Sequence, residues 1–130
     1  MRARIAQHRA AREGQGWRTF EAPLALARVI AELPPKTPVL VDCLTLWVSN
    51  HLLAQSDLAQ ESERLAAAIH AHQGPIIAVA NEVGLGIVPD NALARQFRDA
   101  ARRLNQDLAA LADRVVLVAA GLPLVLKGIL

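Results

Sequence analysis

Short apolar runs alternate along this chain with longer segments of helical periodicity. The runs at 39–43, 76–80 and 115–119 have the length and the Val, Leu and Ile content of buried strands. Apolar positions recur at helical spacing over 44–53, 57–72 and 91–112. Asp57 is predicted to cap the second of these helices, because its carboxylate can accept hydrogen bonds from the free backbone N–H groups of the first turn.

The two ends of the chain follow less regular patterns. Residues 1–13, rich in Ala and Arg, predict a helix, and 17–21 predict an extended segment whose Trp17 and Phe20 pack inward. Pro23 suits the first turn of a helix over 23–32. A turn at 121–123 leads to a last apolar run at 124–126.

Strands that alternate with helices are typical of a parallel sheet covered by helices on both faces. The pattern therefore predicts an α/β fold with a mostly parallel sheet. The length of 130 residues suits a single domain spanning 1–130, and no linker or internal repeat interrupts it.

Composition narrows the classes of function. With 53% apolar and 20% charged residues the chain is too hydrophobic for a disordered protein. A formal charge of +2 and 3% aromatic residues disfavour a nucleic-acid partner. Cys43 is the single cysteine, which excludes a disulfide framework and favours a buried, inert thiol. No signal peptide and no apolar run of about 18 residues is found, so we expect a cytoplasmic protein without a membrane span.

Two acids follow predicted strands. Asp42 ends the run at 39–41, and Glu82 follows Asn81 after the run at 76–80. If these strands are neighbours, both carboxylates lie at the edge where α/β sheets bind ligands. Asp42 then resembles a Walker-B acid that holds Mg²⁺ near nucleotide phosphates. The alternatives are an ordinary strand-ending acid for Asp42 and a cap on the following turn for Glu82.

The first predicted helix carries a stripe of basic residues. Arg4, His8 and Arg12 are spaced four residues apart and project from one side of a helix. Flanking guanidinium groups favour the neutral, nucleophilic imidazole and can bind phosphate, which suits a histidine that attacks a nucleoside triphosphate. The spacing alone is more typical of a solvated basic face than of a nucleophile. The remaining histidines, His51, His70 and His72, show no metal-ligand spacing, and His51 receives no predicted role.

With these residues in place, the chain resembles the adenosylcobinamide kinase/adenosylcobinamide-phosphate guanylyltransferase family of cobalamin synthesis. The resemblance runs along the whole chain. It is carried by RIAQHRAAR at 4–12, WRTFE at 17–21, VDCLT at 41–45, NEVGLGIVP at 81–89, RQFRD at 95–99 and NQ at 105–106. The block from 81 is the most specific of these.

The resemblance implies a P-loop NTPase fold of the RecA-like, three-layer type and two reactions. A kinase step phosphorylates adenosylcobinamide with ATP or GTP, and GMP then moves from GTP to that phosphate through a guanylylated histidine. His8 matches that histidine, and the positions that contact guanine nucleotide are matched by Arg9, Ala10, Ala11, Arg12, Glu21 and Asp42. Asn81 and Glu82 would support the site, Mg²⁺ would lie near Asp42, and family members form trimers.

One departure from the family pattern is pronounced. Family members begin with a strand and a G-x-x-x-x-G-K-[ST] loop, and neither occurs in these 130 residues. Such a loop supplies the backbone N–H groups that cradle phosphates. We therefore expect a chain that lacks the first strand and the P-loop. The alternative is an inactive remnant that binds nucleotide weakly or only assembles with intact subunits.

Overall fold

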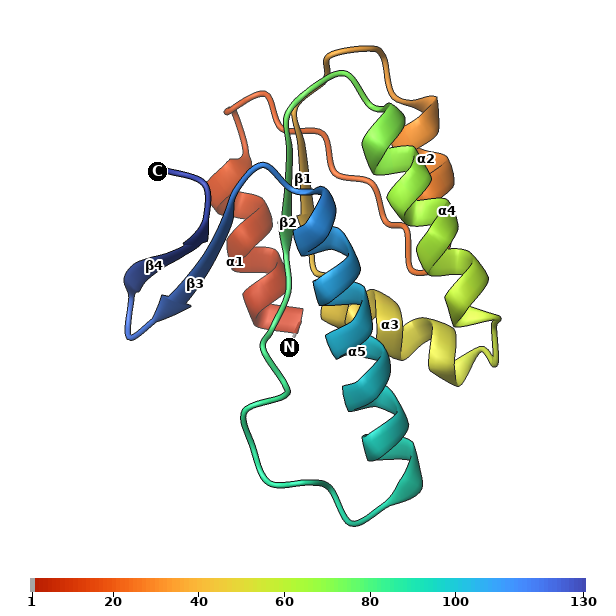
Figure 1. Ribbon diagram of the computed structural model, residues 1–130. Coiled ribbons are helices and arrows are strands. Elements are labelled where there is room, and N and C mark those ends of the chain that lie inside the picture. Colours follow the sequence, from red (N-terminus) through yellow and green to blue (C-terminus); the bar gives the residue numbers. More distant parts are fainter. Residues whose placement is uncertain (1) are drawn as a thin grey trace.

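Five helices and four strands form over residues 2–130, which the computed structural model describes (Figure 1). In chain order they are α1 (Arg2–Arg12), α2 (Leu26–Glu32), β1 (Val39–Asp42), α3 (Leu44–Leu53), α4 (Leu58–Ala71), β2 (Ile76–Val79), α5 (Ala92–Leu111), β3 (Val115–Ala119) and β4 (Leu122–Lys127). The predicted α/β class is confirmed, and most predicted elements are found close to their expected bounds.

Strands β1 and β2 pair in parallel, with Val39 opposite Ile76 and Asp42 opposite Val79. Helices α3 and α4 connect the two strands, and α5 follows β2. One side of the pair packs against α2, α3, α4 and α5. The buried core there consists of Ile30, Val41, Leu44, Trp47, Val48, Leu65, Ala101 and Leu104.

The other side of this strand pair is open among residues 2–130. Leu40 and its register partner Ile77 are 40% and 64% exposed. The prediction of helices on both faces is therefore wrong for the described residues. The physical reason is that α3, α4 and α5 all lie on the side of the pair that carries Val41, and no described element covers the opposite side.

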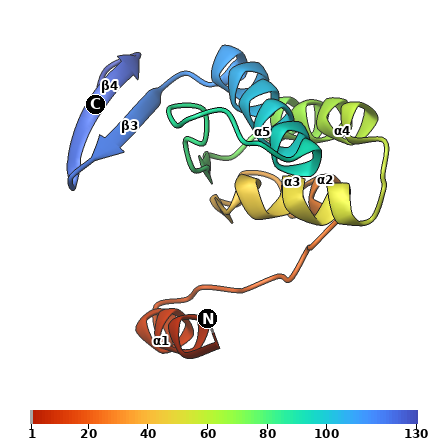
Figure 2. The same ribbon diagram turned by 90° about the horizontal axis from the view of Figure 1, so that it is seen from below.

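Strands β3 and β4 form a separate antiparallel hairpin rather than joining β1 and β2 in one sheet (Figure 2). The turn lies at Ala120 and Gly121, not at 121–123 as expected. Both residues have positive φ, 52° and 75°, which is typical of the two-residue turn that matches strand twist. Lys127 Nζ donates to the carbonyls of Ala109 and Ala110, 3.1 and 2.9 Å away, and so joins the hairpin to the end of α5.

Two predictions for the segment before α2 are also wrong. The helix begins at Leu26 rather than at Pro23, because the carbonyls of Pro23 and Leu24 accept hydrogen bonds from α3 side chains instead of from the next helical turn. Trp17 and Phe20 are each 49% exposed instead of packing inward. Among the described elements α1 borders this segment at Trp17, and it leaves both side chains half-exposed.

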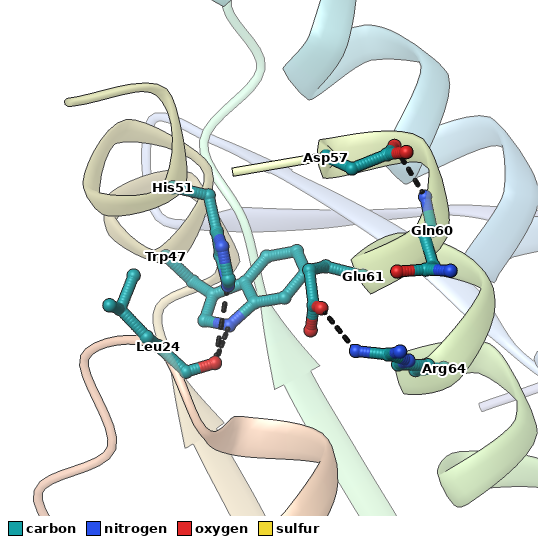
Figure 3. A network of polar contacts seen from close by, with 7 residues as sticks. All are labelled: Leu24, Trp47, His51, Asp57, Gln60, Glu61 and Arg64. Atoms are coloured by element: carbon teal, nitrogen blue, oxygen red, sulfur yellow. Dashed lines mark hydrogen bonds and ion pairs between the residues drawn. The ribbon is translucent and has the colours of Figure 1, made fainter. Parts of the chain in front are cut away.

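The predicted cap at Asp57 is confirmed. Asp57 accepts a hydrogen bond from the backbone N–H of Gln60 at 3.1 Å and caps α4 (Figure 3). Asn91 caps α5 in the same way through the N–H of Ala94 at 2.7 Å.

Cys43 is a free thiol, half-buried rather than buried. Within residues 2–130, no helix has both the length and the apolar character needed to cross a bilayer.

Candidate functional site

The basic stripe predicted on the first helix is present on α1. Arg4, His8 and Arg12 are spaced along one side of the helix, and the His8 side chain is exposed. Arg12 Nε donates to the backbone carbonyl of His8 at 3.1 Å, which holds a guanidinium beside the imidazole. This side of α1 can present an imidazole ring and positive charge to an anionic ligand.

The neighbouring side of α1 faces the segment that follows it. Arg9 forms an ion pair with Glu21, and both side chains are more than half exposed, 57% and 76%. Between α1 and this segment lies an open cavity of about 490 Å³. Its lining consists of Ala6, Arg9, Ala10, Arg12, Glu13, Trp17 and Thr19. The cavity is wide open to solvent rather than enclosed.

His8 does not line that cavity. A helix turns about 100° per residue, so His8 projects from the opposite side of α1 to Ala6 and Ala10. Of the nucleotide-contacting positions implied by the resemblance, Arg9, Ala10 and Arg12 line the cavity, and Glu21 is bonded to one of them. Ala11 is exposed on α1 and does not line it.

Asp42 ends β1 and Glu82 follows β2, and the two strands are neighbours, so the condition set for bringing both acids to one edge is met. Asp42 is exposed at the carboxyl end of β1, and no hydrogen bond or ion pair occupies its side chain within the described residues. Glu82 uses one carboxylate oxygen to accept from the backbone N–H of Gly84 at 2.7 Å. Glu82 therefore caps the turn, which was the alternative interpretation of this residue.

A hydrogen-bonded junction surrounds Asn81. Its backbone N–H donates to Thr45 Oγ1 at 2.7 Å, and Asn105 Nδ2 donates to its carbonyl at 3.5 Å. These contacts tie the end of β2 to the start of α3 and to α5. Thr45 received no separate role from the sequence, because its partner lies 36 residues away.

The described residues contain no group of three or more His, Cys, Asp or Glu side chains that could hold a metal by themselves. A single free carboxylate at Asp42 nevertheless fits Mg²⁺, which usually binds one or two carboxylates together with water and substrate phosphates. The donor set thus fits a metal that arrives with a nucleotide.

Comparison with known proteins decides the family. The family described as cobinamide kinase / cobinamide phosphate guanyltransferase matches residues 1–126. The chain belongs to this family. The resemblance deduced from the motifs is confirmed, and the cobinamide kinase / cobinamide phosphate guanyltransferase family is one of enzymes.

Individual relatives agree with this assignment. The chain is 46% identical to the bifunctional adenosylcobalamin biosynthesis protein CobP of Pseudomonas aeruginosa, over 98% of this chain and 75% of the relative. It is 41% and 38% identical to the bifunctional adenosylcobalamin biosynthesis proteins CobU of Salmonella typhimurium and Escherichia coli. Those two matches each cover 98% of this chain and 78% of the relative.

Proposed function

We propose that this chain carries the guanylyl-transfer machinery of an adenosylcobinamide kinase/adenosylcobinamide-phosphate guanylyltransferase, with His8 as the residue that accepts GMP. The observation that carries the proposal is the exposed imidazole of His8 between Arg4 and Arg12 in a member of this family. An exposed imidazole beside guanidinium groups is suited, in its neutral form, to attack a phosphorus atom.

In the first step, a ring nitrogen of His8 attacks the α-phosphorus of GTP. The bond from that phosphorus to the bridging oxygen breaks, and pyrophosphate leaves with the electron pair. In the second step, a phosphate oxygen of adenosylcobinamide phosphate attacks the same phosphorus and releases His8. The product is adenosyl-GDP-cobinamide.

The neighbouring residues bind and orient the nucleotide in this proposal. Arg9 and Arg12 bind phosphate oxygens beside His8, and Ala10 and Ala11 are further proposed nucleotide contacts on the same helix. Glu21 keeps Arg9 in place through their ion pair. Because both groups are exposed, the pair contributes little to stability, and its role is to orient the guanidinium.

Asp42 is the proposed ligand for Mg²⁺, which would neutralise charge on the nucleotide phosphates. Its side chain is exposed and has no protein partner in the described part of the chain. Asn81 and Glu82 support the same strand edge by fixing the turn after β2. GTP is the substrate of the transfer step, and ATP or GTP feeds the kinase step, which places the reaction in the cytoplasm where these nucleotides are available.

The proposal includes a RecA-like, three-layer fold of the P-loop type. The parallel β1–β2 pair and the free acid at the end of β1 support it. The kinase step requires a phosphate cradle of backbone N–H groups, for which residues 2–130 offer no G-x-x-x-x-G-K-[ST] motif.

A homo-oligomer, a trimer by family resemblance, is part of the proposal. Leu53 and Leu93, 73% and 57% exposed, line an open, mostly apolar cavity of about 320 Å³ between α3 and α5. Exposed apolar groups of this kind are typical of contacts between subunits. Light scattering of the purified chain tests the assembly state.

The experiment for the proposed function is incubation with Mg²⁺ and GTP labelled at the α-phosphorus. We expect a protein-bound label that is lost in acid and kept in alkali, as a phosphoramidate requires. Addition of adenosylcobinamide phosphate should discharge it into adenosyl-GDP-cobinamide. His8→Ala should take no label, whereas the matched control His70→Ala, at an exposed position on α4, should take as much as the wild type. Full labelling of His8→Ala would contradict the assignment.

A second candidate is a chain that binds nucleotide weakly or only assembles with intact subunits. The open strand face with Leu40 and Ile77 exposed favours it, because such a face is suited to receive further structure. Equilibrium binding of GTP separates the two candidates. Binding without formation of the acid-labile label supports the second candidate.

A further inference from the structure

Three side chains of α3 hold the backbone just ahead of α2. Trp47, Asn50 and His51 lie on one side of the helix, three and four residues apart. Trp47 Nε1 and His51 Nε2 lie 3.1 and 3.2 Å from the carbonyl oxygen of Leu24, as Figure 3 shows, and Asn50 Nδ2 donates to that of Pro23 at 3.0 Å. Together they form a clamp on two successive carbonyl groups, which we call the α3 clamp.

The burial of the α3 clamp gives it rigidity. The Trp47 and His51 side chains are only 4% and 3% exposed, and their rings meet edge to face with centroids 4.4 Å apart. Because a carbonyl oxygen can only accept, His51 Nε2 carries the proton that it donates. Its Nδ1 is then a buried acceptor with no partner in the described residues. A leucine would fill this space without an unpaired atom, so the specific contribution of the imidazole is its bond to Leu24.

After α1, the carbonyls of Pro23 and Leu24 are where hydrogen bonds attach the connecting segment to α3. The residues of helix α1 whose burial is described, 3–12, contribute nothing to the core, and Figure 2 shows α1 apart from the layer formed by α2 and α3. Residues 13–25 connect it to that layer without a helix or strand of their own. Glu21, which pairs with Arg9 of α1, lies only two residues before Pro23.

We propose that Trp47, Asn50 and His51 are positioning residues for guanylyl transfer. By fixing the carbonyls of Pro23 and Leu24 they fix Glu21, and through the ion pair with Arg9 they set the orientation of α1 and of His8. They act through the backbone and touch no substrate. This inference rests on the proposed function of His8, although the geometry that it predicts can be measured without activity.

The first measurement is a distance distribution between nitroxide labels at Gln7→Cys on α1 and Glu63→Cys on α4, both exposed positions, in a Cys43→Ser background. With the α3 clamp intact we expect one narrow distribution. His51→Leu should broaden it, and His51→Gln, whose amide nitrogen can replace Nε2, should restore it. A His51→Leu distribution as narrow as the parent's would overturn the proposal.

The second measurement is the rate of GMP labelling of His8 as GTP concentration varies. We expect His51→Leu to lower the rate about tenfold or more, because small displacements of reacting groups are costly. His51→Gln should lie within about threefold of the wild type. Trp47→Phe removes the N–H donor together with the five-membered ring of the indole but keeps an aromatic side chain, so it tests the α3 clamp if His51→Leu fails to fold. If His51→Gln and His51→Leu have equal rates at matched thermal midpoints, the hydrogen bond of His51 has no effect on labelling and the residue contributes only packing.

The two measurements separate the possible failures. If the wild type acquires no label, the proposed function fails while the distance distribution still decides whether the α3 clamp orients α1. If the wild type is labelled and neither measurement responds to the variants, the α3 clamp proposal fails alone.

Discussion

Replacement of Leu65 by alanine should show where the stability of this fold resides. Leu65 lies on α4 with an exposed fraction of 0%, in a cluster with Ile30 of α2 and Leu104 of α5. Truncation to alanine removes three carbon atoms and leaves a cavity. Buried leucines of this kind contribute about 3–5 kcal/mol. Since packed helices surround the site and limit its collapse, we expect a loss of about 3–4 kcal/mol.

That loss is large beside the about 5–15 kcal/mol of stability usual for a domain. It should lower the midpoint of thermal unfolding by roughly 10–15 °C. Urea unfolding followed by circular dichroism gives the free energy directly, and the slope against urea concentration should stay unchanged because the same surface is exposed.

The matched control is Leu85→Ala, the same chemical change at a side chain that is 82% exposed. Its effect should stay within about 0.5 kcal/mol. If Leu65→Ala loses less than about 1 kcal/mol, or no more than Leu85→Ala does, then the packing of α4 does not determine the stability. Either result would refute the placement of the core.

The remaining predictions concern a cap, a close contact and an ion pair. Asp57→Ala should cost about 1 kcal/mol in urea unfolding, because the N–H of Gln60 loses its acceptor, and Asp57→Asn should recover most of it. Gly74→Ala should lower stability by about 1–3 kcal/mol, because a Cβ there would lie 2.6 Å from backbone atoms of Lys36 and Thr37; Gly86→Ala, with open space around it, is the control. Glu21→Gln should leave the thermal midpoint unchanged and slow GMP labelling, since the exposed pair with Arg9 orients rather than stabilises; an unchanged labelling rate would remove Glu21 from the site.

Signals that act over a few residues could be predicted from the sequence. The helix expected over 91–112 is found as α5, Ala92–Leu111, because its periodicity and its Asn91 cap are both local. The cap at Asp57 was predicted for the same reason. The apolar runs indicated that Asp42 and Glu82 lie at strand ends, but not that these strands are neighbours, which the β1–β2 pairing shows.

Interactions between distant parts of the chain could not be predicted in the same way. Pro23 is compatible with a helix start. However, α3 side chains more than 20 residues away bind the carbonyls of Pro23 and Leu24, and α2 begins only at Leu26. His51 received no role because its acceptor is a backbone carbonyl, which no pattern of side chains reveals. The division of the strands into two sheets likewise depends on which strand edges meet, and apolar runs alone do not specify that.

The most direct test of the account is the identity of the peptide that carries GMP after reaction with GTP. Cleavage after glutamate releases residues 1–13, in which His8 is the single histidine, whereas the histidines at 51, 70 and 72 fall in other peptides. The account predicts that, under alkaline conditions, mass spectrometry finds the GMP adduct on the 1–13 peptide alone and assigns it to His8. An adduct on any other peptide, with residues 1–13 unmodified, would contradict it.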